Sequence, residues 1–158
     1  MVGGLFALLL LTGCENDLAE VKALALDDNT EAEIGSEVEI LYSEMGIVNT
    51  RITAPKLKNL NDEEGRTEFP EGLKMYFYNT NKAITSELSA NYGMANDKKG
   101  EMLVSGNVII TGQEGKQLNS EELIWKRNEK RIYSDKFVKI TTPTEIVMGY
   151  GLRAAEEI

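Results

Sequence analysis

Apolar and polar side chains alternate along the chain from Val38 onward, with a period of two residues. In residues 48–54, Val48, Thr50, Ile52 and Ala54 share one face, and the side chains between them are polar. This period is typical of a β-strand with one buried face. The same alternation predicts strands over residues 37–42, 48–54, 73–78, 84–90, 102–104, 108–111, 123–126, 131–134, 137–141 and 145–152.

Turn-forming residues separate these strands. They cluster at residues 44–46, 79–81, 96–100, 113–115, 126–130 and 142–144, and a polar loop spans residues 59–65. No long pattern of helical period follows residue 37. Short strands at this spacing predict an all-β sandwich, jelly roll or barrel. Residues 105–111 also resemble residues 134–141, which indicates a sheet grown by successive hairpins.

The chain begins with an apolar run, residues 5–11, that leads directly into Leu11-Thr12-Gly13-Cys14. The run is much shorter than the roughly 20 residues of a membrane-spanning helix and fits the apolar region of a secretory signal. The residues that follow resemble a bacterial lipoprotein box, in which the new N-terminal Cys carries acyl chains. We therefore expect a signal peptide over residues 1–13 and lipidation at Cys14. The alternative is that Cys14 is an ordinary buried apolar residue.

An acidic stretch follows this segment. Residues 15–37 contain a single basic side chain, Lys22, and few large apolar ones. We expect residues 14–37 to form a solvated tether, with one or two helical turns as the alternative, and residues 38–158 to form one domain. Residues 1–13 lack the Lys or Arg that normally starts a signal, and the strand pattern continues close to Ile158. We therefore expect a misassigned start or a missing N-terminus, and a further strand after Ile158.

The composition excludes several kinds of chemistry. The 158 residues include 17 Lys and Arg against 26 Asp and Glu, a formal charge of −9, with no His and one Cys. Histidine-based triads, zinc sites built on His or several Cys, and intramolecular disulfides are therefore excluded. No basic block is present to neutralise nucleic-acid phosphates. We expect no enzyme activity, no metal or other cofactor, and no nucleic-acid partner.

Two further sequence features support the absence of catalysis. The chain contains no Gly-x-x-x-x-Gly-Lys loop for binding nucleotide phosphates. Glu121 and Glu122 are neighbours in one predicted strand, so their side chains point to opposite faces and cannot act as a catalytic pair.

Several short motifs occur in a fixed order along residues 38–152. They are Tyr42-Ser43-x-x-Gly46, Arg51-Ile52-Thr53-Ala54-Pro55, Phe69-Pro70-x-Gly72-Leu73, Leu88-Ser89-Ala90-x-Tyr92, Gly106-Asn107-Val108, Leu118-Asn119-Ser120-Glu121-Glu122-Leu123-x-Trp125 and Gly149-Tyr150-Gly151-Leu152. In this order and spacing the series resembles the LptC family of lipopolysaccharide-export proteins, in the lipoprotein-like form of Bacteroidetes.

The resemblance implies a twisted, open β jelly roll, or β-taco, of successive antiparallel hairpins with an LptA/OstA-like fold. It implies a protein on the periplasmic face of the inner membrane. Such a protein accepts lipopolysaccharide from an ABC transporter and passes it to a periplasmic, LptA-like bridge protein. Family members are usually held by a transmembrane helix. Here the lipoprotein box lies at that place, so we expect a lipid anchor instead.

A groove for acyl chains needs inward-facing apolar side chains and an opening. The alternation predicts a lining of Ile40, Tyr42, Val48, Ile52, Met75, Phe77, Leu88, Val108, Ile110, Trp125, Val138 and Ile140. The alternative is that these side chains form a closed, dry core. Candidate cations for the phosphates of lipopolysaccharide are Lys126, Arg127, Lys130 and Arg131, with a solvated turn as the alternative.

Folds of this family dock by edge-strand pairing, so an unprotected edge predicts a partner site. The candidates at the transporter-facing end are Val38, Ile40 and Tyr42, and those at the bridge-facing end are Ile146, Met148, Tyr150 and Leu152.

Three functions remain open from the sequence. A lipid carrier predicts a hydrophobic groove that is open to solvent, whereas a scaffolding outer-membrane lipoprotein predicts a closed core. A carbohydrate-binding or hydrolytic surface lipoprotein would need an exposed aromatic platform, for which Trp125 and scattered tyrosines are available.

Overall fold

A computed structural model describes residues 32–155, so the expected signal peptide, Cys14 and most of the expected tether lie outside the described residues. The fold is all-β, as predicted. The strands are β1 (Glu33–Glu44), β2 (Ile47–Asn59), β3 (Arg66–Phe69), β4 (Leu73–Tyr78), β5 (Ile84–Ala90), β6 (Tyr92–Asn96), β7 (Glu101–Gly112), β8 (Gln117–Lys126), β9 (Arg131–Thr141) and β10 (Ile146–Ala155), with short 3₁₀ turns η1 (Gln113–Gly115) and η2 (Arg127–Glu129). Nothing in this part of the chain forms a helix long and apolar enough to cross a bilayer.

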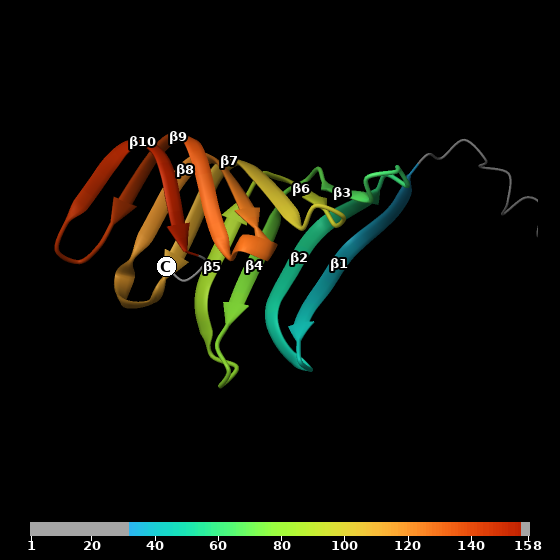
Figure 1. Cartoon of the computed structure of the whole chain (residues 1–158), viewed down its shortest axis with the longest axis horizontal. Helices are drawn as coiled ribbons and strands as arrows, with labels where there is room; N and C mark the ends of the chain where they lie inside the picture. Colours follow the sequence, from blue (N-terminus) through green and yellow to red (C-terminus); the bar gives the residue numbers. More distant parts are fainter. Residues whose placement is uncertain (1–31, 156–158) are drawn as a thin grey trace, which may run out of the picture. The chain divides into compact units, whose positions relative to one another are not determined.

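The strands form one antiparallel sheet whose neighbours are mostly successive hairpins (Figure 1). β7 pairs with β6 through its first half and with β5 through its second half. Further along the same sheet, the first half of β2 pairs with β4 and its end pairs with β3. Consequently β3 and β4 act as one long strand that is interrupted near its middle, and so do β5 and β6. This arrangement confirms the predicted jelly roll of successive antiparallel hairpins.

A line of backbone irregularities, which we call the crease, runs across these strands. Gly72, between β3 and β4, has a φ of 86°, and a Cβ added to it would lie 2.7 Å from the backbone oxygen of Ala90. Gly106 in β7 has a φ of 75°, and its carbonyl accepts a hydrogen bond from the amide of Asn91. Gly151, with a φ of 83°, marks the register shift in β10. Irregularities of this kind bend strands, so the chain turns at the crease between β3 and β4, in β7 and in β10.

The crease divides the sheet into two layers. The first layer contains residues 38–44, 47–54, 73–78, 84–90, 108–112, 117–120, 137–141 and 146–150, and the second contains residues 33–36, 56–59, 66–69, 92–96, 101–105, 122–126, 131–134 and 152–155. Their inner faces touch: the rings of Phe77 and Trp125 lie 6.0 Å apart, and Gly93 lies directly against Leu73.

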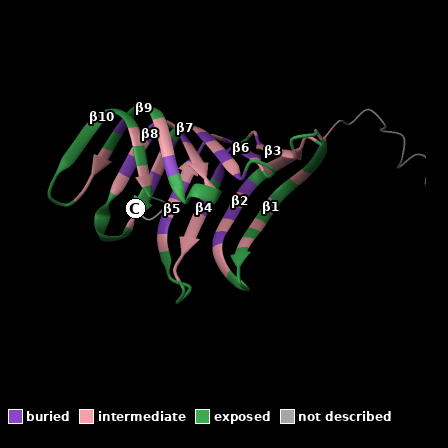
Figure 2. Ribbon diagram, in the orientation of Figure 1, coloured by how far each residue is buried: buried purple, intermediate pink, exposed green. Residues whose placement is uncertain are grey.

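The core lies between the two layers and draws buried side chains from both (Figure 2). Ile52, Met75 and Val108 from the first layer are at most 1% exposed, as are Phe69 and Leu123 from the second. Burying each such side chain contributes about 1.5–3 kcal/mol, so packing between the layers holds the crease folded.

The structure differs from the sequence-based expectation at the start of the domain. β1 begins at Glu33, so residues 33–37, which we expected in the tether, belong to the sheet. They pair with the second half of β2, from Glu33 opposite Asn59 to Ser36 opposite Lys56. Their acidic side chains remain exposed. The acidic composition of these residues therefore concealed a strand that pairs with β2.

Other boundaries differ because bulges interrupt the alternation without ending the strand. The predicted strands 102–104 and 108–111 are both parts of β7, and 131–134 and 137–141 are both parts of β9. β3 was not predicted, because its four residues are too short to show a period. The predicted turns do connect strands in the structure.

Candidate functional site

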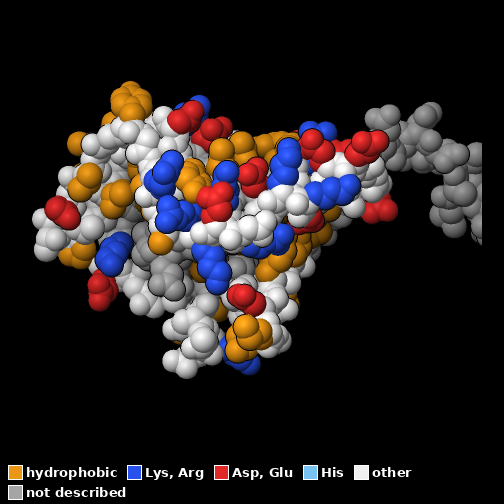
Figure 3. All heavy atoms as spheres, in the orientation of Figure 1, with side chains coloured by type: hydrophobic (Ala, Val, Ile, Leu, Met, Phe, Trp, Pro, Cys, Tyr) orange, Lys and Arg blue, Asp and Glu red, His pale blue; other side chains and the backbone are white. Residues whose placement is uncertain are grey.

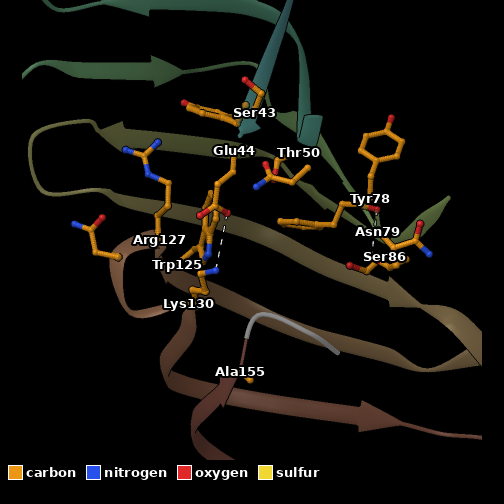
Figure 4. A pocket seen from close by; sticks show the side chains of 15 residues that line it. Ser43, Glu44, Thr50, Tyr78, Asn79, Ser86, Trp125, Arg127, Lys130 and Ala155 are labelled. Carbon is orange, nitrogen blue, oxygen red and sulfur yellow. Dashed lines mark hydrogen bonds and ion pairs between the residues drawn. The ribbon is translucent and has the colours of Figure 1, made fainter. Parts of the chain in front are cut away.

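A cavity of about 1040 Å³ opens between the layers near the hairpin turns (Figure 4). Its first wall comes from β1, β2, β4 and β5, and its second wall comes from β8, η2 and the end of β10. Segments far apart in the sequence therefore form it together. Both walls are parts of inner faces, so the cavity continues from the core towards the outside.

Aromatic side chains line the inner part of this cavity. Phe77 and Trp125 meet edge to face, with an interplanar angle of 88°. The buried hydroxyl side chains of Thr50 and Ser86 lie beside them in the first wall. The indole Nε1 of Trp125 is buried and donates to no acceptor in the described part of the chain. The lining therefore combines apolar rings with polar groups that are able to bind a ligand.

Two contacts bridge the layers at the mouth of the cavity. The guanidinium of Arg127 lies over the ring of Tyr42, 5.3 Å from its centre. The ammonium of Lys130 lies 4.0 Å from a carboxylate oxygen of Glu44, as the dashed line in Figure 4 marks. These contacts connect the β1–β2 hairpin with the turn between β8 and β9.

The environment of Tyr42 raises the pKa of its hydroxyl. Burial raises the pKa of this phenol above its ordinary value of 10.0, the negative charge of Asp97 raises it further, and Arg127 opposes both effects. Tyr42 is therefore available as a neutral hydrogen-bond donor beside the guanidinium.

The structure divides the predicted lining residues between the cavity and the core, with Val48 in neither. Tyr42, Phe77 and Trp125 line the cavity. Eight others are buried in the core or packed against it: Ile40, Ile52, Met75, Leu88, Val108, Ile110, Val138 and Ile140. The remaining residue, Val48, is partly buried and lies outside that core cluster. Lipid contact at all of these positions stays a prediction.

Only two of the four candidate cations, Lys126, Arg127, Lys130 and Arg131, line the cavity. Arg127 and Lys130 line the cavity. Lys126 is held between the carboxylates of Glu101, at 3.4 Å, and Glu129, at 3.5 Å, and these contacts raise its pKa above 10.5. Arg131 is exposed and is not part of the lining. Arg127 and Lys130 are thus the two positioned to meet a ligand.

The sequence did not single out several polar side chains of the cavity. Thr50 and Ser86 occupy inward positions of the alternation, so a signal for their orientation was present. Asn49, Asn79 and Asn128 also line the cavity. Their role depends on the contact between distant turns, which no local pattern reveals.

β1 and β10 are the two outer strands of the sheet, each with a neighbour on one side only within residues 32–155. The predicted edge residues therefore lie on sheet edges. The end formed by β9 and β10 exposes large apolar side chains (Figure 3): Phe137, Ile146, Val147, Met148 and Tyr150. Docking of partners at these edges stays a prediction.

The described residues include no group of three or more acidic or cysteine side chains arranged to bind a metal ion.

A creased antiparallel sheet with an apolar interior and a cavity between its layers defines the class of β-taco jelly rolls. The chain belongs to the LptC family: the family model described as "Lipopolysaccharide-assembly, LptC-related" matches residues 5–157. The match confirms the resemblance found in the sequence motifs. No curated protein matched the chain.

Membership of this family assigns the chain to lipopolysaccharide transport in the export system of Gram-negative bacteria. It also associates the chain with the periplasm and the inner membrane. The family consists of transport components and is not known for enzyme activity.

Proposed function

We propose that this chain accepts lipopolysaccharide from the inner-membrane ABC exporter and passes it to the periplasmic bridge protein. The acyl chains enter between the two layers through the cavity mouth. The observation that carries this proposal is the cavity itself, because its aromatic wall of Tyr42, Phe77 and Trp125 is continuous with the apolar core.

Entry of acyl chains requires the layers to separate along their open side. Residues such as Val108 and Ile110 are 0% and 2% exposed, so lipid reaches them only when the layers part. Each acyl methylene that leaves water for this interior contributes about 0.8 kcal/mol, which offsets the packing lost between the layers. The crease acts as the hinge, because backbone hydrogen bonds across it persist while the inner faces separate.

The two sheet edges provide the docking sites in this proposal. β1 faces the transporter, and β10 faces the bridge protein, so that the inner faces of adjacent jelly rolls form a continuous path. ATP hydrolysis by the transporter supplies the energy. Acyl chains on Cys14 hold the chain at the periplasmic face of the inner membrane, because several buried chains give stable anchoring.

A scaffolding lipoprotein without lipid cargo is the alternative. The tight packing of Ile52, Met75 and Val108 favours it, because a core that never opens would look the same. The two functions differ in whether lipid ever contacts the inner face.

Photo-crosslinking in cells tests the proposal. A benzophenone amino acid at Phe77 or Trp125 should capture lipopolysaccharide while the transporter hydrolyses ATP. The same probe at Lys74 or Thr111, which are exposed on the first layer, should capture none. No capture at the inner two positions would favour the scaffold. Equal capture at all four positions would show contact that is not specific to the inner face and would also contradict the proposal.

A further inference from the structure

Arg127 at the cavity mouth forms no ion pair with a carboxylate among residues 32–155. Its guanidinium instead lies over the ring of Tyr42, 5.3 Å from the ring centre. Stacking on a ring leaves the in-plane N–H donors of a guanidinium available to an oxyanion. Arg127 is therefore suited to receive an anionic group.

Lys130 lies on the same turn and is paired only loosely. Its ammonium is 4.0 Å from the Glu44 carboxylate, and the side chains are 72% and 62% exposed. Exposed pairs of this length are weak, because water and salt screen them. A ligand anion with more charge than one carboxylate can take the place of Glu44.

Trp125 adds an unused donor to the same cavity. Its buried Nε1–H has no acceptor among the described residues, and a buried donor without an acceptor is unfavourable. An oxygen of a bound ligand would satisfy it. Three donors of different kinds thus line one cavity, whereas Lys126, on the same turn, is already held by two carboxylates.

We propose that Arg127 and Lys130 form a subsite for the phosphate of a phosphorylated amphiphile, and that Glu44 occupies this subsite as an internal competitor in the free protein. A phosphate group has a greater negative charge than a carboxylate and offers three acceptor oxygens, so it displaces Glu44 and binds both cations. The inference rests on the proposed function, because the acyl chains of the same ligand occupy the space behind the subsite.

The single tryptophan makes the subsite directly measurable, since Trp125 lines the cavity and is the only Trp of the chain. The full chain is titrated with lipopolysaccharide before and after enzymatic removal of its lipid phosphates, and with inorganic phosphate alone. Tryptophan fluorescence follows occupancy. Retention of each ligand by the immobilised protein is measured in parallel, which provides a second readout.

The expected result is tighter binding of the phosphorylated form. Glu44→Gln should tighten that form about two- to five-fold and leave the dephosphorylated form unchanged, because the competitor is weakly held. The double variant R127Q/K130Q should lose roughly ten-fold or more for the phosphorylated form alone. Lys74 and Glu87 form a comparable exposed pair at 3.8 Å outside the cavity, so K74Q and E87Q are matched controls and should change neither affinity.

Two other results would overturn the inference and separate it from the proposed function. Equal binding of both forms, unaffected by the variants at positions 44, 127 and 130, would remove the subsite but leave lipid transport intact. Inorganic phosphate binding as tightly as the phosphorylated lipid would replace the headgroup subsite with a general anion site. If neither lipid form bound in either measurement, the proposed function itself would be contradicted.

Discussion

Gly72 shows how much the crease depends on one missing side chain. Its φ of 86° strains any other residue, and an added Cβ would lie 2.7 Å from the Ala90 oxygen, which is backbone and cannot swing away. We expect Gly72→Ala to lower the free energy of unfolding by about 2–4 kcal/mol. Urea denaturation measures the loss. Gly46→Ala is the control, since Gly46 has a φ of 78° but no atom within 4 Å. Equal losses at both positions would show that the crease relaxes around a methyl group.

Asp62 gives a pH-dependent prediction at the same scale. Its carboxylate accepts hydrogen bonds from the Arg66 side chain and from the backbone amides of Glu64 and Arg66, which closes the turn before β3. The hydrogen bond from the Arg66 side chain is the largest cause that lowers the pKa of Asp62 below 3.8. The folded pKa is below the unfolded one, so this contact stabilises the fold above the unfolded pKa. The contribution is lost as the pH falls through the folded pKa.

The measurement is an NMR titration of the Asp62 carboxyl carbon. Arg66→Gln should raise the pKa of Asp62 towards its ordinary value, while Lys58→Gln, which removes a cation paired with Glu68, should leave it unchanged. An unchanged pKa in R66Q would assign the shift to the backbone amides instead.

Individual inward positions were predictable, but their roles were not. The period of two predicted Thr50, Phe77 and Trp125 on inner faces, and in the structure all three line the cavity. Which of them line the cavity depends on where the turn between β8 and β9 lies relative to the β1–β2 hairpin. The contact of Arg127 with Tyr42 joins residues far apart in sequence, and no local pattern encodes it.

At the scale of elements, hairpins were predictable because each strand and turn is a local feature. The joining of strands across the crease was not. In β7 the alternation keeps its phase, but Gly106 supplies no inward side chain, so the inward set appears to end at Val104 and restart at Val108. In β8 the irregularity shifts the alternation by one residue, from Leu118 and Ser120 to Leu123. β1 escaped prediction at its start for a different reason: an edge strand with exposed acidic side chains has a composition similar to that of a tether.

The hairpin of β9 and β10 gives a prediction for an element. Phe137 and Tyr150 face each other across it on the outer side, with ring centres 5.4 Å apart, and are 45% and 83% exposed. We expect Tyr150→Ser to cost less than about 1 kcal/mol, because little burial is lost. Ile110→Ala in the core should cost about 2–5 kcal/mol. Thermal and urea unfolding compare them, and similar losses would show that this hairpin is part of the core.

For the described domain as a whole, the proposed function gives its two free edges different partners: the transporter at β1 and the bridge protein at β10. Backbone groups of β10 alternate in direction, so each residue bonds either to β9 or towards the open edge. A proline at Val147 or at Met148 would remove the backbone N–H of that residue. Both side chains are more than half exposed, so replacing either one loses little packing. One of V147P and M148P therefore weakens the sheet, and the other removes only a donor of the edge. The variant that retains the wild-type unfolding temperature identifies the edge position.

That stable proline variant should block transfer to the bridge protein without blocking loading. Lipopolysaccharide would then accumulate, and the ATP-dependent adduct at Phe77 should increase over that of the chain with an intact edge. The proline variant with the lower unfolding temperature is the control, because it shows how destabilisation of the sheet by itself changes the amount of adduct. Loss of the adduct in the stable variant would instead identify β10 as the loading edge and reverse the assignment of the two edges. An unchanged adduct together with normal lipopolysaccharide export would show that β10 is not a docking edge, because a strand adding there needs the donor that proline removes.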